Sequence, residues 1–342
     1  MKKHLNPVAN HFEDLLLSIV VPVFNESAML PTFLEQMIPI LKKLPLKTEL
    51  IFIDDGSTDN SAEYLRQALD NYPGQKLIKL SRNFGKEAAI TAGLEHASGD
   101  AVVIMDADLQ DPPECIPTML NTWLSGTDVV LMQRRSRAGE TLFKRLSAHL
   151  FYRFLNRISQ TKIPVDTGDF RLMSRRSVDA LLTLRERNRY MKGLFAWVGM
   201  PTKVIRYDRA QRAAGKTKWN YCGLFGLAFE GLTSFSISPL RWAVGVGLIS
   251  ALTGALFGIW IVAKTVFIGD VTAGYPSLMA IITFLGGVQL FSIGLVGEYV
   301  GKAYIEAKQR PVYLTEEILE SQSVQTYLEI KRKGTLQHAK AI

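Results

Sequence analysis

Two acidic side chains directly follow an apolar run near the middle of the chain. Residues 101–105 read Ala-Val-Val-Ile-Met, and Asp106 and Asp108 come next, two positions apart. On an extended backbone such positions point to the same side, so the carboxylates would repel each other unless a cation lay between them. Carboxylates and the amide oxygen of Gln110 suit a hard divalent cation. The alternative is a solvated acidic turn before a helix that starts near Pro112.

The apolar run also indicates where these side chains lie. A short, continuous apolar run is typical of a strand that is buried on both faces, as in a parallel sheet. In such sheets, ligands bind outside the carboxyl ends of the strands. Further apolar runs at residues 17–21, 50–53 and 77–80 also end in polar clusters, which are Val23–Ser27, Asp54–Asp59 and Ser81–Lys86.

Helical patterns separate the predicted strands. They cover about residues 28–44, 61–71, 86–96 and 116–124, and a fifth strand is expected at 129–132. Ser27 is the expected N-cap of the first helix. The alternation predicts an α/β fold with an open, mostly parallel sheet, whose polar clusters converge on one edge. A turn near Pro22 and the carboxylate of Asp55 suit a base and a ribose, and a metal at Asp108 suits a diphosphate. Neither a Gly-x-Gly-x-x-Gly fingerprint nor a P-loop is present.

Composition narrows the choice of partners. The chain has 342 residues and a formal net charge of +8, which suits either nucleic acid or an anionic membrane. No zinc-finger spacing or basic, aromatic-rich sheet motif is present, whereas long apolar segments are, so a membrane is favoured over nucleic acid. The two cysteines match no metal or redox spacing and indicate a reducing compartment. Residues 1–16 carry acidic side chains and do not resemble a signal peptide.

The last third of the chain predicts membrane segments. Residues 219–237 are rich in apolar side chains, with Glu230 the only charged one, and are expected to form an amphipathic helix lying on the bilayer, the alternative being a core helix. Residues 242–263 and 271–297 are uncharged, and a span needs about 20 residues. Basic residues flank the outer ends of this pair, which predicts that both termini are cytoplasmic. The expected boundaries are an extension at 1–16, a catalytic domain at 17–218, the interfacial helix at 219–237, a two-helix transmembrane hairpin at 238–300, and a cytoplasmic helix and tail at 301–342.

The motifs together resemble family 2 glycosyltransferases, which have a GT-A-type fold, and among them the polyprenyl-phosphate sugar transferases. The matching stretches are Val21–Glu26, Asp54–Asp59, Arg82–Lys86, Asp106–Pro113, Thr167–Leu172 and Arg212–Trp219. They span the region from about Leu17 to Trp219, and the apolar segments beyond fit the membrane-anchored branch. The sequence departs from the family at Ser27, where a second Glu is frequent, and at Thr217, where Ser is common.

The resemblance implies roles for individual residues. The nucleotide sugar would be held by Pro22, Asn25, Glu26, Asp55, Lys86 and Asp106. Mg2+ or Mn2+ would be held by Asp106, Asp108 and Gln110 and would neutralise charge on the departing diphosphate. For Lys86, a surface lysine at the start of a helix is an equally good interpretation.

Asp169 occupies the position of the family's catalytic carboxylate. The usual role is that of general base towards the acceptor. However, a phosphate monoester has a second pKa of about 6, so at neutral pH the acceptor is largely a dianion that needs little deprotonation. Asp169 would then orient Arg171, or bind the proton of the residual monoanion. A third interpretation is a cap of the following helix.

Basic residues must bind the acceptor phosphate. The candidates are Arg134, Arg212, Lys216 and Lys218, and the alternative is a basic face at an anionic leaflet. The resemblance implies a UDP-sugar donor, with UDP-glucose the first choice and GDP-mannose and UDP-aminosugars open. It also implies an undecaprenyl phosphate acceptor, a homotetramer, and a place in a bacterial inner membrane.

Two other functions were weighed against this one. A processive polysaccharide synthase shares the sheet motifs but carries Gln-x-x-Arg-Trp, and the nearest string here, Ser238–Trp242, lacks the glutamine. An inactive nucleotide-sugar-binding scaffold is disfavoured by the presence of Asp106, Asp108 and Asp169 together. A transferase that loads one sugar onto a polyprenyl phosphate is therefore the predicted function.

Overall fold

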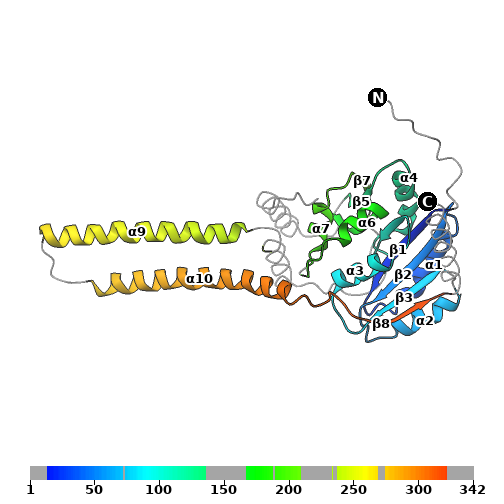
Figure 1. Ribbon diagram of the computed structural model, residues 1–342, viewed down its shortest axis with the longest axis horizontal. Helices are drawn as coiled ribbons and strands as arrows, with labels where there is room; N and C mark the ends of the chain where they lie inside the picture. Colours follow the sequence, from blue (N-terminus) through cyan, green and yellow to red (C-terminus); the bar gives the residue numbers. More distant parts are fainter. Residues whose placement is uncertain are drawn as a thin grey trace, which may run out of the picture. The chain divides into compact units, whose positions relative to one another are not determined.

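A mixed sheet forms the centre of the first part of the chain in the computed structural model (Figure 1). The structure describes residues 14–71, 74–135, 167–187, 189–208, 233, 237–268 and 274–321. Within them, eight strands run in the order β7-β5-β6-β4-β1-β2-β3-β8. Their bounds are β1 Leu16–Val23, β2 Lys47–Asp54, β3 Gln75–Leu80, β4 Ala101–Ile104, β5 Val129–Arg134, β6 Thr167–Ser174, β7 Thr202–Tyr207 and β8 Thr315–Glu320.

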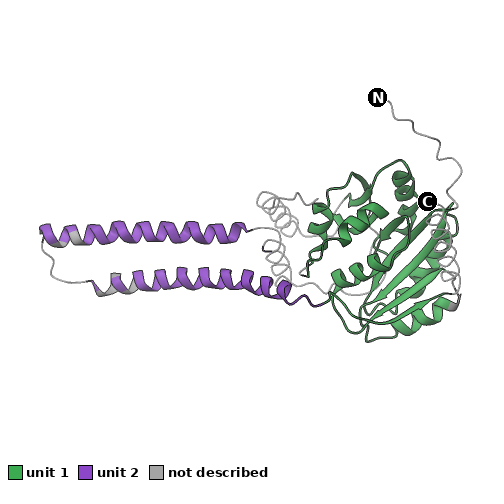
Figure 2. Cartoon of the chain, in the orientation of Figure 1, with its two compact units in different colours: residues 1–152, 162–219, 311–342 green, residues 153–161, 220–310 purple. Residues whose placement is uncertain are grey.

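The chain divides into two units (Figure 2). Residues 1–152, 162–219 and 311–342 form the first, and residues 153–161 and 220–310 form the second. The sheet belongs to the first unit, together with helices α1 Leu30–Leu41, α2 Ser61–Asn71, α3 Lys86–His96, η2 Pro113–Cys115, α4 Ile116–Leu124, α6 Arg175–Leu182 and α7 Met191–Trp197. The second unit contains two long helices, α9 Ser238–Ile268 and α10 Tyr275–Ala307.

The predicted mostly parallel α/β sheet is present in the amino-terminal half. β1 pairs in parallel with both β2 and β4, and β2 pairs in parallel with β3. Helices cover both faces. On one face, α3 lies so close that a Cβ on Gly93 would collide with Val20 and come within 2.7 Å of Ile53. On the other face, the rings of Phe33 in α1 and Phe52 in β2 pack edge to face at 6.0 Å. The burial of both faces explains why the strands are continuous apolar runs.

Of the four helices predicted between the strands, all but the first agree with the structure. α2 and α4 have the predicted bounds, and α3 starts at Lys86 as expected. α1 begins at Leu30, and its N-cap is Met29, which makes no side-chain hydrogen bond. The prediction that Ser27 caps this helix is therefore wrong. The backbone N–H of Ser27 instead donates to Asp59 Oδ2 at 3.1 Å, which ties the loop before α1 to the loop after β2.

β6 enters the sheet antiparallel, between β4 and β5, which the sequence analysis did not predict. Its register pairs Ile104, the last residue of β4, with Arg171. Because β6 runs in the opposite direction, its first residues lie at the carboxyl end of β4. Asp169 therefore reaches the same sheet edge as Asp106, although it comes at the start of its strand and not after it.

β8 is a second antiparallel addition, in a segment that was expected to be cytoplasmic helix and tail. Thr315–Glu320 pairs with β3 at the edge of the sheet. Glu317 forms an ion pair with Arg66 of α2 at 2.7 Å, and Glu316 forms one with Lys79 at 3.0 Å. Ser321 accepts a hydrogen bond from the backbone of Gly74 at 2.8 Å. The chain thus returns to the first unit after the second long helix.

The two long helices of the second unit match the predicted apolar segments. Ser238–Ile261 and Ile281–Ala307 are long and apolar enough to cross a membrane. Almost none of their side chains is buried within the protein, as expected of helices that lie in lipid and unlike those of a soluble core. α10 also continues past the predicted end of the hairpin at 300, as far as Ala307. Apart from residues 233 and 237, the predicted interfacial helix at 219–237 lies outside the described residues, as do residues 1–13 and 322–342.

Candidate active site

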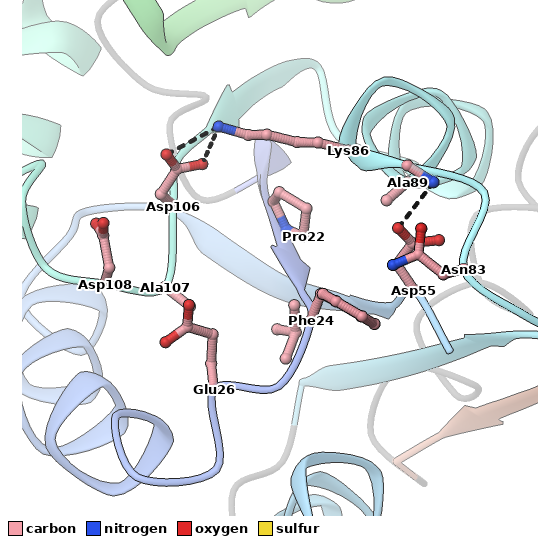
Figure 3. A pocket seen from close by; sticks show the side chains of 12 residues that line it. Pro22, Phe24, Glu26, Asp55, Asn83, Lys86, Ala89, Asp106, Ala107 and Asp108 are labelled. Atoms are coloured by element: carbon pink, nitrogen blue, oxygen red, sulfur yellow. Dashed lines mark hydrogen bonds and ion pairs between the residues drawn. The ribbon is translucent and has the colours of Figure 1, made fainter. Parts of the chain in front are cut away.

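A pocket of about 240 Å3 opens at the carboxyl edge of β1, β2 and β4 (Figure 3). It is lined by Pro22, Val23, Phe24, Glu26, Asp55, Asn83, Gly85, Lys86, Ala89, Asp106, Ala107 and Asp108. Polar clusters from the predicted loops therefore do converge on one edge. Five of the six residues expected to hold the nucleotide sugar lie in this wall, and the sixth, Asn25, does not.

Asp55 holds the loop between β3 and α3 in place. Its two carboxylate oxygens accept hydrogen bonds from the backbone N–H groups of Phe84, at 2.7 Å, and Gly85, at 3.0 Å. Burial raises the pKa of Asp55, and these two hydrogen bonds oppose that rise. Gly56 allows the approach, because a Cβ there would collide with the Arg82 backbone and lie 2.5 Å from the Asn83 nitrogen. Asp55 thus shapes the pocket wall as well as lining it.

Asn25 connects two loops. Its φ of 54° places it in the left-handed region, which Asn tolerates better than most residues. Its Oδ1 accepts hydrogen bonds from the backbone N–H groups of Thr58, at 2.8 Å, and Asp59, at 3.3 Å, while its own N–H donates to Ser57 Oγ. Asn25 therefore supports the pocket through the 57–59 loop and does not line it.

Asp106 and Asp108 lie together in the loop after β4, with Glu26 on the same wall (Figure 3). The loop is bent at Leu109, which has a positive φ of 56°. Gln110 donates its backbone N–H to Asp108 Oδ1 at 3.1 Å, and it does not belong to the pocket wall. Among the described residues, no group of three or more His, Cys, Asp or Glu side chains is arranged to hold a metal ion.

The two carboxylates nevertheless fit a divalent cation that arrives with a phosphate ligand. Mg2+ is usually bound through one or two carboxylates plus substrate phosphates, and not by an all-protein cage. Asp106 and Asp108 supply two hard oxygen ligands in a pocket with space for a diphosphate. The pKa of the neighbouring Asp111 is raised to about 6 by burial and by the charge of Asp106. This shift indicates that negative charge is concentrated in the loop.

Lys86 links the loop after β4 to β6. Its Nζ lies 2.7 and 2.8 Å from the two carboxylate oxygens of Asp106, and 2.8 Å from Oδ2 of Asp169. Figure 3 shows this side chain reaching from α3 across to Asp106. Burial would raise the pKa of Asp169, but the attraction between the charges prevails, so the pKa of Asp169 is lowered and that of the partly exposed Lys86 is raised. Of the two interpretations of Lys86, the structure therefore supports a place in the site over a free surface lysine.

One carboxylate oxygen of Asp169 pairs with Lys86, and the other can accept a hydrogen bond. Its side chain is 12 % exposed, and its Oδ1 is buried without a hydrogen-bond partner among the described residues. A buried acceptor without a donor is costly unless a ligand supplies one. The expectation that Asp169 caps the next helix is wrong, because Ser174 is the N-cap of α6 and accepts from the Ser177 N–H.

Arg171 is buried beside Asp169 and makes several contacts. It is only 4 % exposed, and its guanidinium donates to the backbone carbonyls of Gly168, at 2.8 Å, and Asp169, at 3.2 Å. It also stacks on the Phe195 ring of α7 at 3.6 Å. Burial lowers its pKa to about 10, at which it is still charged at neutral pH. The guanidinium binds the backbone of β6, and its charge lies close enough to help lower the pKa of the Asp169 carboxylate, so the role of Asp169 in orienting Arg171 stays a prediction.

Two charged residues beside the site were missed by sequence reasoning. Glu87 accepts a hydrogen bond from the backbone N–H of Met191 at 3.3 Å, and its pKa is raised to about 7 by burial and by the charge of Asp169. Lys192 of α7 is close enough to lower the pKa values of both Glu87 and Asp169. Glu87 directly follows Lys86 and could have been singled out. Nothing in the sequence connects α7 with this edge.

The predicted acceptor-binding residues are only partly described. Arg134, at the end of β5, interacts with Tyr207, whose hydroxyl donates to Asp111 at 2.6 Å. Its Nε is buried without a hydrogen-bond partner among the described residues. Arg212, Lys216 and Lys218 lie outside the described residues.

The sequence is similar to those of known proteins and to known family models. Residues 18–182 match the family described as Glycosyl transferase family 2, and residues 238–303 match the GtrB C-terminal hairpin. The chain is 46% identical over 298 residues to the bactoprenol glucosyl transferase of Shigella phage SfV, which covers 87% of this chain and 97% of that protein. It is 43% identical over 302 residues to the prophage bactoprenol glucosyl transferase homolog of Escherichia coli K12, covering 88% and 99%.

Among solved structures, glucosyl-3-phosphoglycerate synthase from Mycobacterium tuberculosis, in complex with Mn2+, UDP-glucose and phosphoglyceric acid, superposes with a TM-score of 0.45 at 21% identity, over 64% of this chain and 78% of that one. The family match and the observed sheet confirm the predicted GT-A-type α/β class. The chain therefore belongs to glycosyltransferase family 2, as an enzyme of the branch that includes the bactoprenol glucosyl transferases.

Proposed function

We propose that this enzyme transfers a single glucose from UDP-glucose to the phosphate of a membrane polyprenyl phosphate, undecaprenyl phosphate first, at the cytoplasmic face. One observation carries the proposal. Asp106 and Asp108 line the same pocket as Pro22 and Asp55, and Lys86 connects Asp106 to the carboxylate of Asp169. The names of the relatives, bactoprenol glucosyl transferases, support both the sugar and the lipid.

On the donor side, the uridine would lie against Pro22, Phe24 and Asp55, and the diphosphate would extend towards Asp106 and Asp108. These two carboxylates would hold Mg2+ or Mn2+, which supplies charge neutralisation for the departing UDP. Gln110 would contribute at most from outside the pocket wall. The apolar contacts position the base, and the acidic loop positions the diphosphate, so the anomeric carbon is held near Asp169.

On the acceptor side, a phosphate oxygen attacks the anomeric carbon from the face opposite the diphosphate. The bond from that carbon to the UDP oxygen breaks, UDP leaves with the electron pair, and the anomeric configuration inverts. A dianionic acceptor carries no proton that a base must remove. Asp169 then acts by position: Lys86 fixes its Oδ2, and its unpartnered Oδ1 accepts a hydrogen bond from a sugar hydroxyl or from a protonated acceptor.

The acceptor phosphate would be bound by basic side chains, and its lipid chain would lie in the membrane. Arg134, Arg212, Lys216 and Lys218 remain the proposed phosphate ligands, and Lys192 joins them because it lies beside Asp169. α9 and α10 would cross the bacterial inner membrane, and the basic residues that flank the pair support cytoplasmic termini. A homotetramer, which the family resemblance implies, is part of the same proposal, and light scattering of the detergent-solubilised protein tests it.

The test is a donor panel with full-length enzyme in undecaprenyl phosphate vesicles. UDP-glucose, GDP-mannose and UDP-N-acetylglucosamine, each labelled in the sugar, are offered with Mg2+ or Mn2+, and lipid products are separated by thin-layer chromatography. We expect one labelled lipid from UDP-glucose, lost in EDTA and in Asp108→Ala but kept in Asp128→Ala, which changes a carboxylate before β5. Transfer that persists in EDTA would contradict the metal role, and a ladder of products would favour a processive synthase.

A further inference from the structure

The Lys86 ammonium binds carboxylate oxygens that a divalent cation would also need. It contacts both oxygens of Asp106 and one oxygen of Asp169, so a single positive charge is shared between two carboxylates. The lysine side chain is 45% exposed, which leaves it room to move towards the pocket. A divalent cation that uses Asp106 as a ligand needs at least one of the two oxygens that the ammonium covers.

The backbone of Lys86 is fixed, and only the side chain is free to change partners. Lys86 is the first residue of α3, and Gly85 before it has its N–H on Asp55 Oδ2 at 3.0 Å. Phe84 is held by the other oxygen of the same carboxylate. The lysine therefore starts from a constant point at the pocket wall, within reach of the Asp106 loop, of Asp169 and of any diphosphate in the pocket.

We propose, on the basis of the function above, that Lys86 is an internal cation that competes with the divalent metal for Asp106, so that the metal enters only together with the nucleoside diphosphate. Before the donor binds, the ammonium balances part of the negative charge of the loop. The arriving metal displaces it from Asp106 by electrostatic repulsion, while Asp169 stays in contact with the ammonium and the donor diphosphate gives it a new partner. Lys86 is thus a positioning residue that makes metal binding depend on the donor diphosphate.

The charges support this order. Without Lys86, the carboxylates of Asp106 and Asp108 would attract a divalent cation more strongly, because no ammonium would compete for Asp106. With Lys86 on both oxygens of Asp106, a metal that arrives alone must first displace the ammonium. The diphosphate changes this balance, since it adds negative oxygens to the metal and accepts the displaced ammonium. The metal should therefore increase the affinity for the nucleotide, and the nucleotide should increase the affinity for the metal by the same factor.

The experiment measures Mn2+ binding to full-length, detergent-solubilised protein by electron paramagnetic resonance, with and without UDP. In the wild type we expect weak binding of Mn2+ alone and at least tenfold tighter binding with UDP. In Lys86→Gln, Mn2+ alone should bind about tenfold more tightly than in the wild type, because a positive charge a few ångströms away is gone, and the enhancement by UDP should shrink. Lys86→Arg keeps the charge and should keep weak binding of Mn2+ alone.

Lys79→Gln is the matched control, because Lys79 also pairs with a carboxylate, Glu316, but lies outside the pocket. Unchanged or weaker binding of Mn2+ alone in Lys86→Gln would overturn the proposal, as would a loss of UDP affinity in EDTA with no change in metal affinity. Absence of Mn2+ binding in every form, even with UDP, would overturn it as well. Failure of sugar transfer with these binding results intact would remove only the proposed function.

Discussion

Replacing Asp169 by asparagine separates the two roles that a carboxylate can have at this position. Asparagine keeps the size and one acceptor oxygen, and it removes the charge that Lys86 contacts at 2.8 Å. A general base would lose its function with the charge. A positioning residue would only make weaker hydrogen bonds. The loss of a general base should depend on the protonation of the acceptor and hence on pH, whereas a weaker hydrogen bond should not.

The structure makes proton transfer to Asp169 unfavourable. An ordinary aspartic acid has a pKa of about 3.9 and the acceptor phosphate one of about 6, so transfer of the acceptor proton costs about 3 kcal/mol. Burial would raise the pKa of Asp169, but the charge of Lys86 lowers it below its usual range, which widens this gap. A charge-assisted hydrogen bond contributes about 1.5–3 kcal/mol, so its loss in Asp169→Asn should reduce kcat roughly 10- to 100-fold.

The measurement is kcat of wild type and Asp169→Asn from about pH 5.5 to 8.5, an interval that brackets the acceptor pKa, with saturating UDP-glucose and lipid. Asp169 is ionised throughout this interval because its pKa lies below its usual value, so we expect a wild-type to mutant ratio that stays flat. Asp128→Asn, at a carboxylate paired with Arg176, controls for the substitution itself. A ratio that falls steeply as pH rises through the acceptor pKa would refute positioning and restore the general base.

Two further predictions concern stability. Gly56→Ala should lower the free energy of unfolding by about 3 kcal/mol, since a Cβ at φ +68° meets the backbone of Arg82; thermal unfolding measures it, with Gly254→Ala in open space as the control, and equal midpoints would contradict it. The raised pKa of Glu87, about 7, means that the folded state holds the proton more tightly than the unfolded chain, so stability falls as pH rises from about 4.5 to about 7. Glu87→Gln should therefore raise the unfolding midpoint at pH 8 and not at pH 4.5, and a gain that is equal at both values would disprove this sign.

The sequence predicted the parts of the site that depend on local patterns. The run 101–105 and the carboxylates after it are visible without the fold, because a strand buried on both faces must be apolar and a ligand edge must be polar. The bounds of α2 and α4 follow from periodicity in the same way. Asp169 could be placed only by resemblance, since β6 is antiparallel and reaches the edge from the opposite direction.

Contacts between distant segments could not be predicted. The sequence gives no sign that Lys86 of α3 bridges Asp106 and Asp169, or that the Arg171 guanidinium is buried against Phe195 of α7. β8 was missed for a related reason. Four of its six residues are polar and none is buried, so no apolar alternation identifies a strand that is held by Arg66, Lys79 and pairing with β3.

The loop between β3 and α3 connects the two ends of the pocket. Asp55, on the nucleotide side, binds the N–H groups of Phe84 and Gly85, and Lys86 follows immediately with its ammonium on the catalytic side. α3 is held in turn by its close approach to β1 and β2 at Gly93. Because the lysine backbone is fixed from both directions, a ligand that changes the partners of its side chain changes Asp106 and Asp169 together. On the role proposed for Lys86, occupation of the donor site would therefore be a condition for the charge arrangement in which the acceptor is attacked.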